Sequence, residues 1–160
     1  MENYLMLNGK RIDLTEEQIK TLGFEVKKDY FERGGEYFYI TPQGNVTNEF
    51  ESNCCLTSEC RYKVGNYCTD ENLMKQRALH ETLDRLLWRF SMQNDGDKID
   101  WNNNYQNKYY IYFINNGNLF VDYNTSYKTQ LVYFYTKEIA QRAIDEIIKP
   151  FMKEHPEFVW

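Results

Sequence analysis

The sequence predicts an α+β fold in which antiparallel β-hairpin or meander units are each covered by a helix. Short segments rich in aromatic and β-branched residues alternate with turns that contain Gly and Asn, which is typical of hairpins. Two later segments have apolar residues at spacings of three and four, which indicates amphipathic helices. With 160 residues the chain can bury one sizeable core, so we expect a single compact domain over residues 1–160.

Residues 1–34 are expected to form a small hairpin and a short helix. Asn8-Gly9 lies between short apolar flanks and favours a type I′ turn. Thr15 and Gln18 have the spacing of a capping box, in which each residue's side chain accepts the other's backbone N–H. The predicted helix begins at Thr15 and ends at Leu22.

Residues 35–92 are expected to form a first unit of strands and a helix. Glu36–Thr41 and Asn45–Phe50 flank a Pro-Gln-Gly turn and predict a hairpin. After a loop, Arg61–Val64 can return to the sheet as a third strand. The main helix is then expected from Thr69, which stands at its cap, because apolar residues from there on recur at helical spacing. These residues are Leu73, Met74, Ala78, Leu79, Leu83, Leu86, Leu87 and Phe90.

Residues 93–107 are polar and rich in Asn, which predicts a connection, and residues 108–160 are expected to form a second unit. Its predicted strands, in meander order, are Lys108–Ile114, Leu119–Tyr123 and Leu131–Tyr135. Thr136 is expected to cap a last helix with an apolar stripe, and Pro150 and Pro156 to mark the end of that helix.

The two units resemble each other in sequence. Placing Phe38-Tyr39-Ile40 over Tyr109-Tyr110-Ile111 also brings together two Gly-Asn turns and two Thr residues at predicted helix caps. A degenerate internal duplication would explain this, with Trp101 as a wedge between the halves. The alternative, that turn and cap chemistry recruits the same residues twice, stays open.

Charge and hydropathy restrict the classes of partner. The formal net charge of −5 opposes non-specific binding to a nucleic-acid backbone and suits docking on a basic surface. No apolar run is long enough to cross a bilayer, and the first ten residues lack the pattern of a secretory signal. We therefore expect a cytoplasmic protein that does not bind membranes.

The four cysteines, Cys54, Cys55, Cys60 and Cys68, lie within fifteen residues and suggest a zinc site. However, two of them are adjacent, whereas paired zinc ligands are usually separated by two to four residues. We therefore expect reduced thiols and no bound metal.

No catalytic motif is present. The only histidines are His80 and His155, and the sequence has no phosphate-binding loop, no dinucleotide fingerprint and no H-E-x-x-H zinc motif. We therefore predict no catalytic residues, no cofactor and no enzymatic activity. Three arginines on the main helix could hold an anion, but pairing with nearby acidic residues is the favoured interpretation; the residues are Arg77, Arg85 and Arg89, with Glu81 and Asp84.

Aromatic residues are unusually frequent, at 17% of the chain with 14 tyrosines. Exposed rings beside amide side chains can form a binding surface, because they stack on a base or give a protein partner contact area at low entropic cost. A sheet whose outer face is simply rich in tyrosine is the alternative. The candidate binding residues are Trp101, Tyr105, Tyr109, Tyr110, Tyr123 and Tyr127.

Over nearly its whole length the chain resembles a group of small proteins encoded by phages and prophages of Firmicutes. The resemblance rests on the segments LNGKRIDLTEEQIKTLGFE, RYKVGNY, LLWRFS, IDWNNNYQNKYYIYF, VYFYTKEIAQRAIDEI and PFMKEHPEFVW. These segments contain no chemistry that assigns a functional residue. The resemblance implies a phage setting, in which small proteins without enzyme motifs often antagonise host defence.

The expected function is therefore counter-defence by stoichiometric binding, with a basic nuclease surface of a CRISPR-Cas or other defence effector as the partner. One alternative is a sponge that sequesters an immune signalling nucleotide, which would favour a homo-oligomer with pockets between subunits. The other is a replication or recombination accessory that binds single-stranded nucleic acid on the tyrosine-rich sheet.

Overall fold

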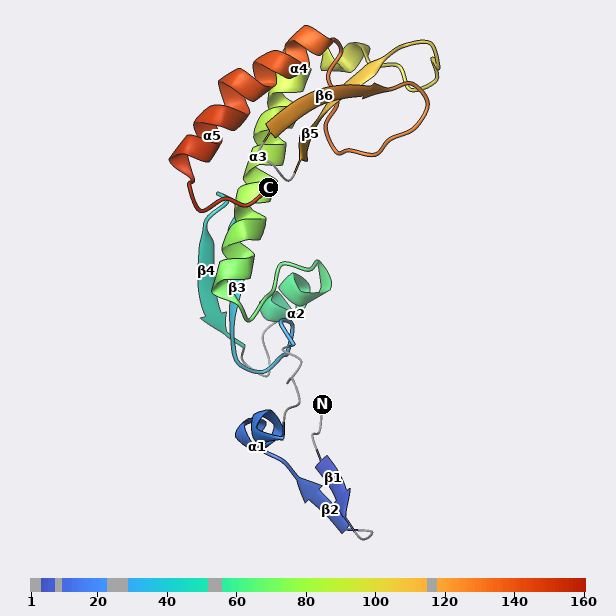
Figure 1. The fold of residues 1–160 in the computed structure, drawn as a ribbon. Coiled ribbons are helices and arrows are strands. Elements are labelled where there is room, and N and C mark those ends of the chain that lie inside the picture. Colours follow the sequence, from blue (N-terminus) through green and yellow to red (C-terminus); the bar gives the residue numbers. More distant parts are fainter. Residues whose placement is uncertain (1–3, 8–9, 23–28, 52–55, 115–117) are drawn as a thin grey trace.

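The computed structural model describes residues 4–7, 10–22, 29–51, 56–114 and 118–160. Within these residues the protein has the α+β architecture expected from the sequence, with three two-stranded antiparallel sheets (Figure 1). The strands are β1 (Tyr4–Leu7), β2 (Lys10–Asp13), β3 (Glu36–Ile40), β4 (Val46–Phe50), β5 (Lys108–Ile114) and β6 (Asn118–Asn124). The helices are α1 (Glu16–Thr21), α2 (Leu56–Lys63), α3 (Glu71–Gln93), the 3₁₀ turn η1 (Gly96–Lys98), α4 (Lys137–Ala143), the π-helical segment η2 (Ile144–Ile148) and α5 (Lys149–Glu154).

The N-terminal hairpin and helix form as predicted. β1 and β2 pair in antiparallel fashion, although the expected Asn8-Gly9 turn lies outside the described residues. The capping box is present at the start of α1. The Thr15 N–H donates to Gln18 Oε1 at 2.9 Å, and the Gln18 N–H donates to Thr15 Oγ1 at 3.3 Å. This reciprocal pair satisfies two N–H groups that the start of a helix would leave without partners.

In the first unit, the β3–β4 hairpin lies between α3 and α2. Phe38, Ile40 and Val46 pack with Met74 of α3 on one face. On the other face, the Tyr37 ring stacks on another tyrosine, Tyr67, with ring centroids 4.3 Å apart. Side chains of β3 are thereby packed on both faces of this short hairpin.

The prediction of a strand at Arg61–Val64 is wrong. The first three of these residues form the last turn of helix α2, and Val64 follows as its C-cap. An ion pair of 2.5 Å between Glu59 and Lys63 spans one turn of the helix. Gly65, with φ of +72°, ends it in a Schellman motif, in which the Gly65 and Asn66 amides donate to the carbonyls of Tyr62 and Arg61. The Gly-Asn pair is therefore a helix stop rather than a strand turn.

Helix α3 is capped by Asp70 and not by Thr69, as the sequence had suggested. The Asp70 carboxylate accepts the Leu73 N–H at 3.1 Å. Thr69 is instead bound to the preceding segment, because its N–H donates to the Tyr30 carbonyl at 2.8 Å. The helix starts one position later than the Thr-x-x pattern indicates.

In the second unit, β5 and β6 pair over seven positions, but the expected third strand, Leu131–Tyr135, is reduced to one bridge between Phe134 and Tyr109. The tyrosine beside Phe134 explains this difference. The Tyr133 hydroxyl accepts the N–H of Thr129 at 2.6 Å and that of Gln130 at 3.2 Å, which closes a tight turn before the bridge. These hydrogen bonds replace those of a longer ladder.

The C-terminal helix begins as predicted, with Thr136 accepting the Ile139 N–H at 3.3 Å. Of the two prolines expected to mark its end, only Pro156 lies beyond the helix, because Pro150 is inside α5. The chain continues as helix to Glu154 through the wider π-helical segment η2. A π segment changes the hydrogen-bond spacing just before the proline, where the missing N–H would otherwise interrupt an α-helix.

The first and second units share one arrangement. In each unit the first strand contains a buried residue, and the next residue forms a β-bridge with the segment just before the following helix. A buried isoleucine comes two positions after the bridging residue. The equivalent pairs are Tyr37 and Lys108, Phe38 and Tyr109, Ile40 and Ile111, and the bridged Cys68 and Phe134. For the first strands this is the register in which the two sequences were superposed. The superposed Thr69 and Thr136 do not coincide, because the equivalence of Cys68 with Phe134 places Asp70 with Thr136. The duplication stays a prediction.

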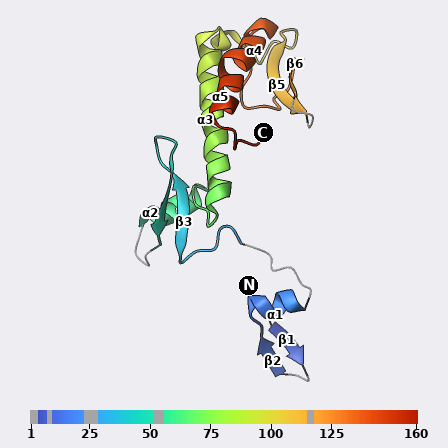
Figure 2. The ribbon, with the colours of Figure 1, turned by 60° about the vertical axis from the view of Figure 1, so that its left-hand side comes forward.

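Helix α3 passes through both units (Figures 1 and 2). Met74 and Ala78, in its first half, belong to the small core with β3 and β4. Leu83, Leu87 and Phe90, in its second half, belong to the larger core with β5, α4, η2 and α5. One 23-residue helix therefore joins two cores.

Candidate functional site

The second half of α3 has two neighbouring pockets, and Leu131 and Val132 line both of them. We call the first the indole pocket, after Trp88 of α3 and Trp101 of the connection. We call the second the Asp84 pocket. Because the positions from His80 to Met92 span twelve residues of helix, the two pockets together extend about 18 Å along α3.

The indole pocket encloses about 160 Å³ and is bordered by exposed apolar side chains. Trp88 is 58% exposed, Leu131 is 83% exposed, and Met92 is also exposed. Scattered apolar residues are normal on a protein surface, but a Trp, a Met and a Leu around one hollow form a patch. Trp and Met are also residue types that protein interfaces favour.

Buried polar contacts hold the wall of the indole pocket in place. The Ser91 hydroxyl, fully buried in α3, donates to the Tyr133 carbonyl at 2.5 Å. Trp101 meets the Tyr133 ring edge to face, with centroids 4.8 Å apart. The Lys128 ammonium lies 4.6 Å from the centroid of the Trp101 ring, within cation–π range. The pocket is therefore preformed, which reduces the entropic cost of binding.

Lys108 anchors the connection beneath Trp101. This lysine is fully buried, and its ammonium donates to the carbonyls of Asn103 at 2.6 Å, Gln106 at 3.0 Å and Thr125 at 2.7 Å. Three acceptors satisfy all three donors of the ammonium group. The charge is thus bound to backbone, and it orders the loops on either side of Trp101.

A row of aromatic rings leads from the indole pocket across the outer face of the β5–β6 sheet. Tyr133 contacts Tyr110 at 5.8 Å, Tyr110 contacts Tyr112 at 6.1 Å, and Tyr112 stacks on Phe120 at 5.7 Å between centroids. Burial is the main cause that raises the pKa of the Tyr110 phenol, and nearby Asp122 also raises it. The row therefore forms one continuous apolar surface with Trp101.

The structure brings together only part of the predicted tyrosine set. Trp101 and Tyr110 belong to the aromatic row, and Tyr127, which is exposed, interacts electrostatically with Tyr110. Tyr109 and Tyr123 pair across the strands and point to the opposite, core-facing side of the sheet. Tyr105 is 98% exposed in the connection and has no ring contact within the described part of the chain. Trp101 contacts Tyr133 of the second unit and lines the indole pocket together with Trp88 of α3, which belongs to the predicted first unit.

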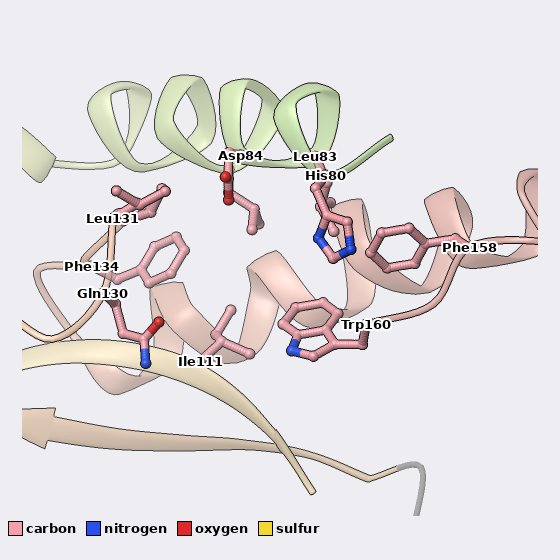
Figure 3. A pocket seen from close by; sticks show the side chains of 11 residues that line it. His80, Leu83, Asp84, Ile111, Gln130, Leu131, Phe134, Phe158 and Trp160 are labelled. Atoms are coloured by element: carbon pink, nitrogen blue, oxygen red, sulfur yellow. The ribbon is translucent and has the colours of Figure 1, made fainter. Parts of the chain in front are cut away.

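The Asp84 pocket lies between α3, β5, the segment around Leu131 and the C-terminal tail (Figure 3). It encloses about 110 Å³. His80 and Asp84 reach it from α3, Ile111 lies on the opposite side, and Trp160 closes one end. Gln76 fixes the tail, because its side-chain amide donates to the Glu157 carbonyl at 2.7 Å and accepts the Val159 N–H at 3.0 Å.

The other candidate constellations are accounted for by local contacts. Glu81 binds Arg77 at 2.9 Å and Arg85 at 3.8 Å, which confirms the expected pairing of these two helical arginines. Cys68 is buried beside β3 and Cys60 is exposed, both as free thiols, whereas Cys54 and Cys55 lie outside the described residues. In the ranges that the structure describes, no group of three acidic, His or Cys side chains could hold a metal ion.

Sequence reasoning missed Trp88, Met92 and Leu131. One signal was available, because Trp88 and Met92 lie one turn apart on α3 but off the stripe formed by Leu83, Leu87 and Phe90. A tryptophan outside the apolar stripe of a helix indicates a surface contact. Leu131 had no such signal, since its segment was expected to be a strand.

Searches against protein-family models, curated proteins and solved structures give no match to the chain. Within the described ranges, none of the helices combines the length and the apolar character that crossing a membrane requires. The fold and the two pockets are therefore the basis for a functional assignment.

Proposed function

We propose that the protein is a phage-encoded, non-catalytic counter-defence protein that binds an effector of host defence stoichiometrically, through the α3 face. A CRISPR-Cas nuclease with a basic surface is the leading partner. The resemblance to small Firmicutes phage proteins supports the phage setting, and the net charge of −5 supports a basic partner surface.

The observation on which the proposal depends is the exposed apolar rim of the indole pocket. Trp88 and Leu131 keep more than half of their surface in solvent, although burying such side chains is favourable by about 1.5–3 kcal/mol each. A protein partner that covers them recovers this free energy. Tryptophan is also one of the residue types that most often anchor a protein interface.

Binding without turnover fits the chemistry of this face. Side chains around the indole pocket are aromatic or aliphatic, apart from the Ser91 hydroxyl, which donates to a carbonyl, and Lys128, which lies over Trp101. Such a surface recognises shape and apolar area. The adjoining Asp84 and Asp122 place negative charge at its edges, where it can steer a basic partner.

The test is co-purification of the full chain with individual defence effectors, followed by isothermal titration calorimetry on the effector that is retained. We expect a defined stoichiometry and a dissociation constant that weakens as salt increases. Because hot-spot residues contribute 2 kcal/mol or more, Trp88→Ser and Leu131→Ser should each lower the affinity by about 30-fold.

Leu73→Ser is the matched control, because Leu73 is also an exposed apolar residue of α3 but lies in its first half, away from both pockets. It should leave the affinity unchanged. Repeated turnover of a nucleotide or polymer by the purified chain would contradict the proposal, as would an affinity that is equal for wild type and Trp88→Ser.

A second candidate is binding of single-stranded nucleic acid, which the exposed rings of Phe120 and Tyr127 beside Lys128 favour. Bases could stack on these rings, although Asp122 on the same face opposes a phosphate backbone. A filter-binding assay at low salt tests this candidate. Retention of an oligonucleotide at micromolar protein, lost in Phe120→Ser, would favour it over effector binding.

A further inference from the structure

The carboxylate of Asp84 is partly buried, and among the residues that line its pocket only His80 can carry a positive charge. No Lys or Arg is among the lining residues, and the described part of the chain provides no hydrogen bond or ion pair to this carboxylate. The pKa of Asp84 is raised, mainly by burial. The charge of His80 lowers this pKa, and the charge of Glu81 raises it. Apart from this effect of His80, the ionised carboxylate has no stabilising partner among the described residues, and a bound cation would supply one.

The walls of the same pocket are aromatic. Phe134 and Phe158 are buried in the lining, and Trp160 lies at the rim, edge to face with Phe158 at 6.1 Å between centroids. His80 tilts against Phe158 at 4.7 Å. An aromatic wall attracts a cation through the negative face of the ring, so the wall and the carboxylate favour the same kind of ligand. In Figure 3 the side chains of Asp84, His80 and Trp160 surround one hollow.

We propose that the Asp84 pocket receives the side chain of an arginine that projects from the partner protein. A guanidinium group would direct its N–H donors to the Asp84 carboxylate and would lie among the aromatic side chains of the pocket wall. This inference rests on the proposed function, and it names the element of the basic partner that the α3 face recognises.

Three properties favour arginine over other cations. The guanidinium is planar, so it stacks on an indole better than a compact ammonium does. It is weakly hydrated, which lowers the cost of entering a pocket that is mostly apolar. The cavity of about 110 Å³ has room for several waters, and the guanidinium head has only four non-hydrogen atoms. The stem of the side chain would then cross the exposed Leu131 at the pocket mouth.

The pocket can be tested without the partner by titrating the full chain with N-acetyl-arginine amide and following two-dimensional NMR spectra. We expect saturable shifts of the Trp160 indole N–H and the Ile111 amide, with a millimolar dissociation constant for this isolated side chain. The neutral isostere, N-acetyl-citrulline amide, should bind at least tenfold more weakly. Equal binding of the two compounds would overturn the proposal.

Asp84→Asn should weaken the binding of N-acetyl-arginine amide at least tenfold, and Trp160→Leu about fivefold. Asp145→Asn is the control, because Asp145 is an exposed carboxylate of η2 that pairs with Lys149 at 2.6 Å; it should bind the compound like wild type. Far-UV circular dichroism verifies that each variant is folded. Unchanged binding in the folded Asp84→Asn variant would reject the pocket.

The outcomes separate this proposal from the proposed function. If the arginine compound binds through Asp84 but no effector is retained, the pocket stands and the proposed function fails. If an effector binds wild type and Asp84→Asn equally while the arginine compound does not bind, the proposed function stands and the pocket fails. Trp88→Ser should weaken effector binding but bind the arginine compound like wild type, because Trp88 does not line this pocket.

Discussion

At the scale of single residues, two polar side chains order the loops of this protein from inside. Glu51 follows β4, and its carboxylate accepts hydrogen bonds from the Arg33 guanidinium, from the Gly34 N–H at 2.8 Å and from the Tyr67 hydroxyl at 3.1 Å. Lys108 performs the same role in the second unit with three backbone carbonyls. In both cases one charged group replaces the contacts that a longer sheet would have provided.

The Glu51 cluster predicts a pH dependence of stability. The hydrogen bond from Arg33 is the largest cause that lowers the pKa of Glu51, to about 2, and the Gly34 N–H and the Tyr67 hydroxyl act in the same direction. Because the folded-state pKa lies below the ordinary value of 4.5, this carboxylate stabilises the fold above about pH 4.5. That contribution should disappear as the pH falls from about 4.5 to about 2.

Urea unfolding of wild type and Glu51→Gln between pH 2 and pH 7 measures this contribution. The variant should be less stable at pH 7, because its amide presents a donor to groups that are themselves donors, and the difference should vanish near pH 2. Glu154→Gln, at an exposed position of α5, is the control and should match wild type throughout. A stability difference for Glu51→Gln that is independent of pH would contradict the assignment.

At the scale of elements, capping and turn residues mark where helices start and end. Which of several candidate residues forms the cap depends on the contacts of the adjoining segments. The Gly65-Asn66 pair ends α2 because the preceding residues are helical. Thr136 caps α4 as expected, whereas Thr69 loses the equivalent role to Asp70 through its bond to Tyr30. A further glycine, Gly96, shows how closely one turn packs on another.

Gly96 has no space for a side chain. A Cβ at this position would lie 2.5 Å from Ser91 Oγ and 2.7 Å from the Ser91 carbonyl oxygen. Gly96→Ala should therefore push η1 away from α3, break the bond from Ser91 to Tyr133 and destabilise the protein by about 2 kcal/mol. Thermal unfolding measures this loss. Gly35→Ala is the matched control, since no atom lies within 4 Å of the added methyl; comparable losses in both variants would argue against the steric explanation.

At the scale of the whole molecule, α3 is the helix that packs in the cores of both larger units. Its first half contacts the β3–β4 core and its second half contacts the larger C-terminal core, and both pockets of the candidate binding face lie on the second half. A rigid helix that belongs to two cores should make them unfold together, since breaking either one removes packing from the same element.

This coupling can be tested with Thr82, which lies in α3 between Ala78 of the first core and Leu83 of the second. In wild type, hydrogen exchange in increasing urea should show the β3–β4 and β5–β6 peptides becoming unprotected at the same concentration. Thr82→Pro interrupts the helix and should separate the two midpoints. Thr82→Ala keeps the helix and should behave like wild type; separate midpoints in wild type would show that α3 does not couple the units.

The sequence by itself determined the elements whose cause is local. Periodicity located α3 and α4, the Thr15–Gln18 and Thr136 caps marked two helix starts, and strand composition with turn residues predicted the two larger hairpins. These patterns act within a few residues, so a single chain displays them fully. The same holds for the pairing of Arg77 and Arg85 with Glu81, which one helical turn brings together.

Only the tertiary structure decided which side chains share a surface. It placed Trp101 beside Trp88 in one pocket and replaced the third strand of the second unit by a single bridge. Each of these outcomes depends on contacts between segments far apart in the chain, such as the bond from Ser91 to Tyr133. Local propensity does not predict such contacts, because they stabilise the fold only once the distant segments have packed together.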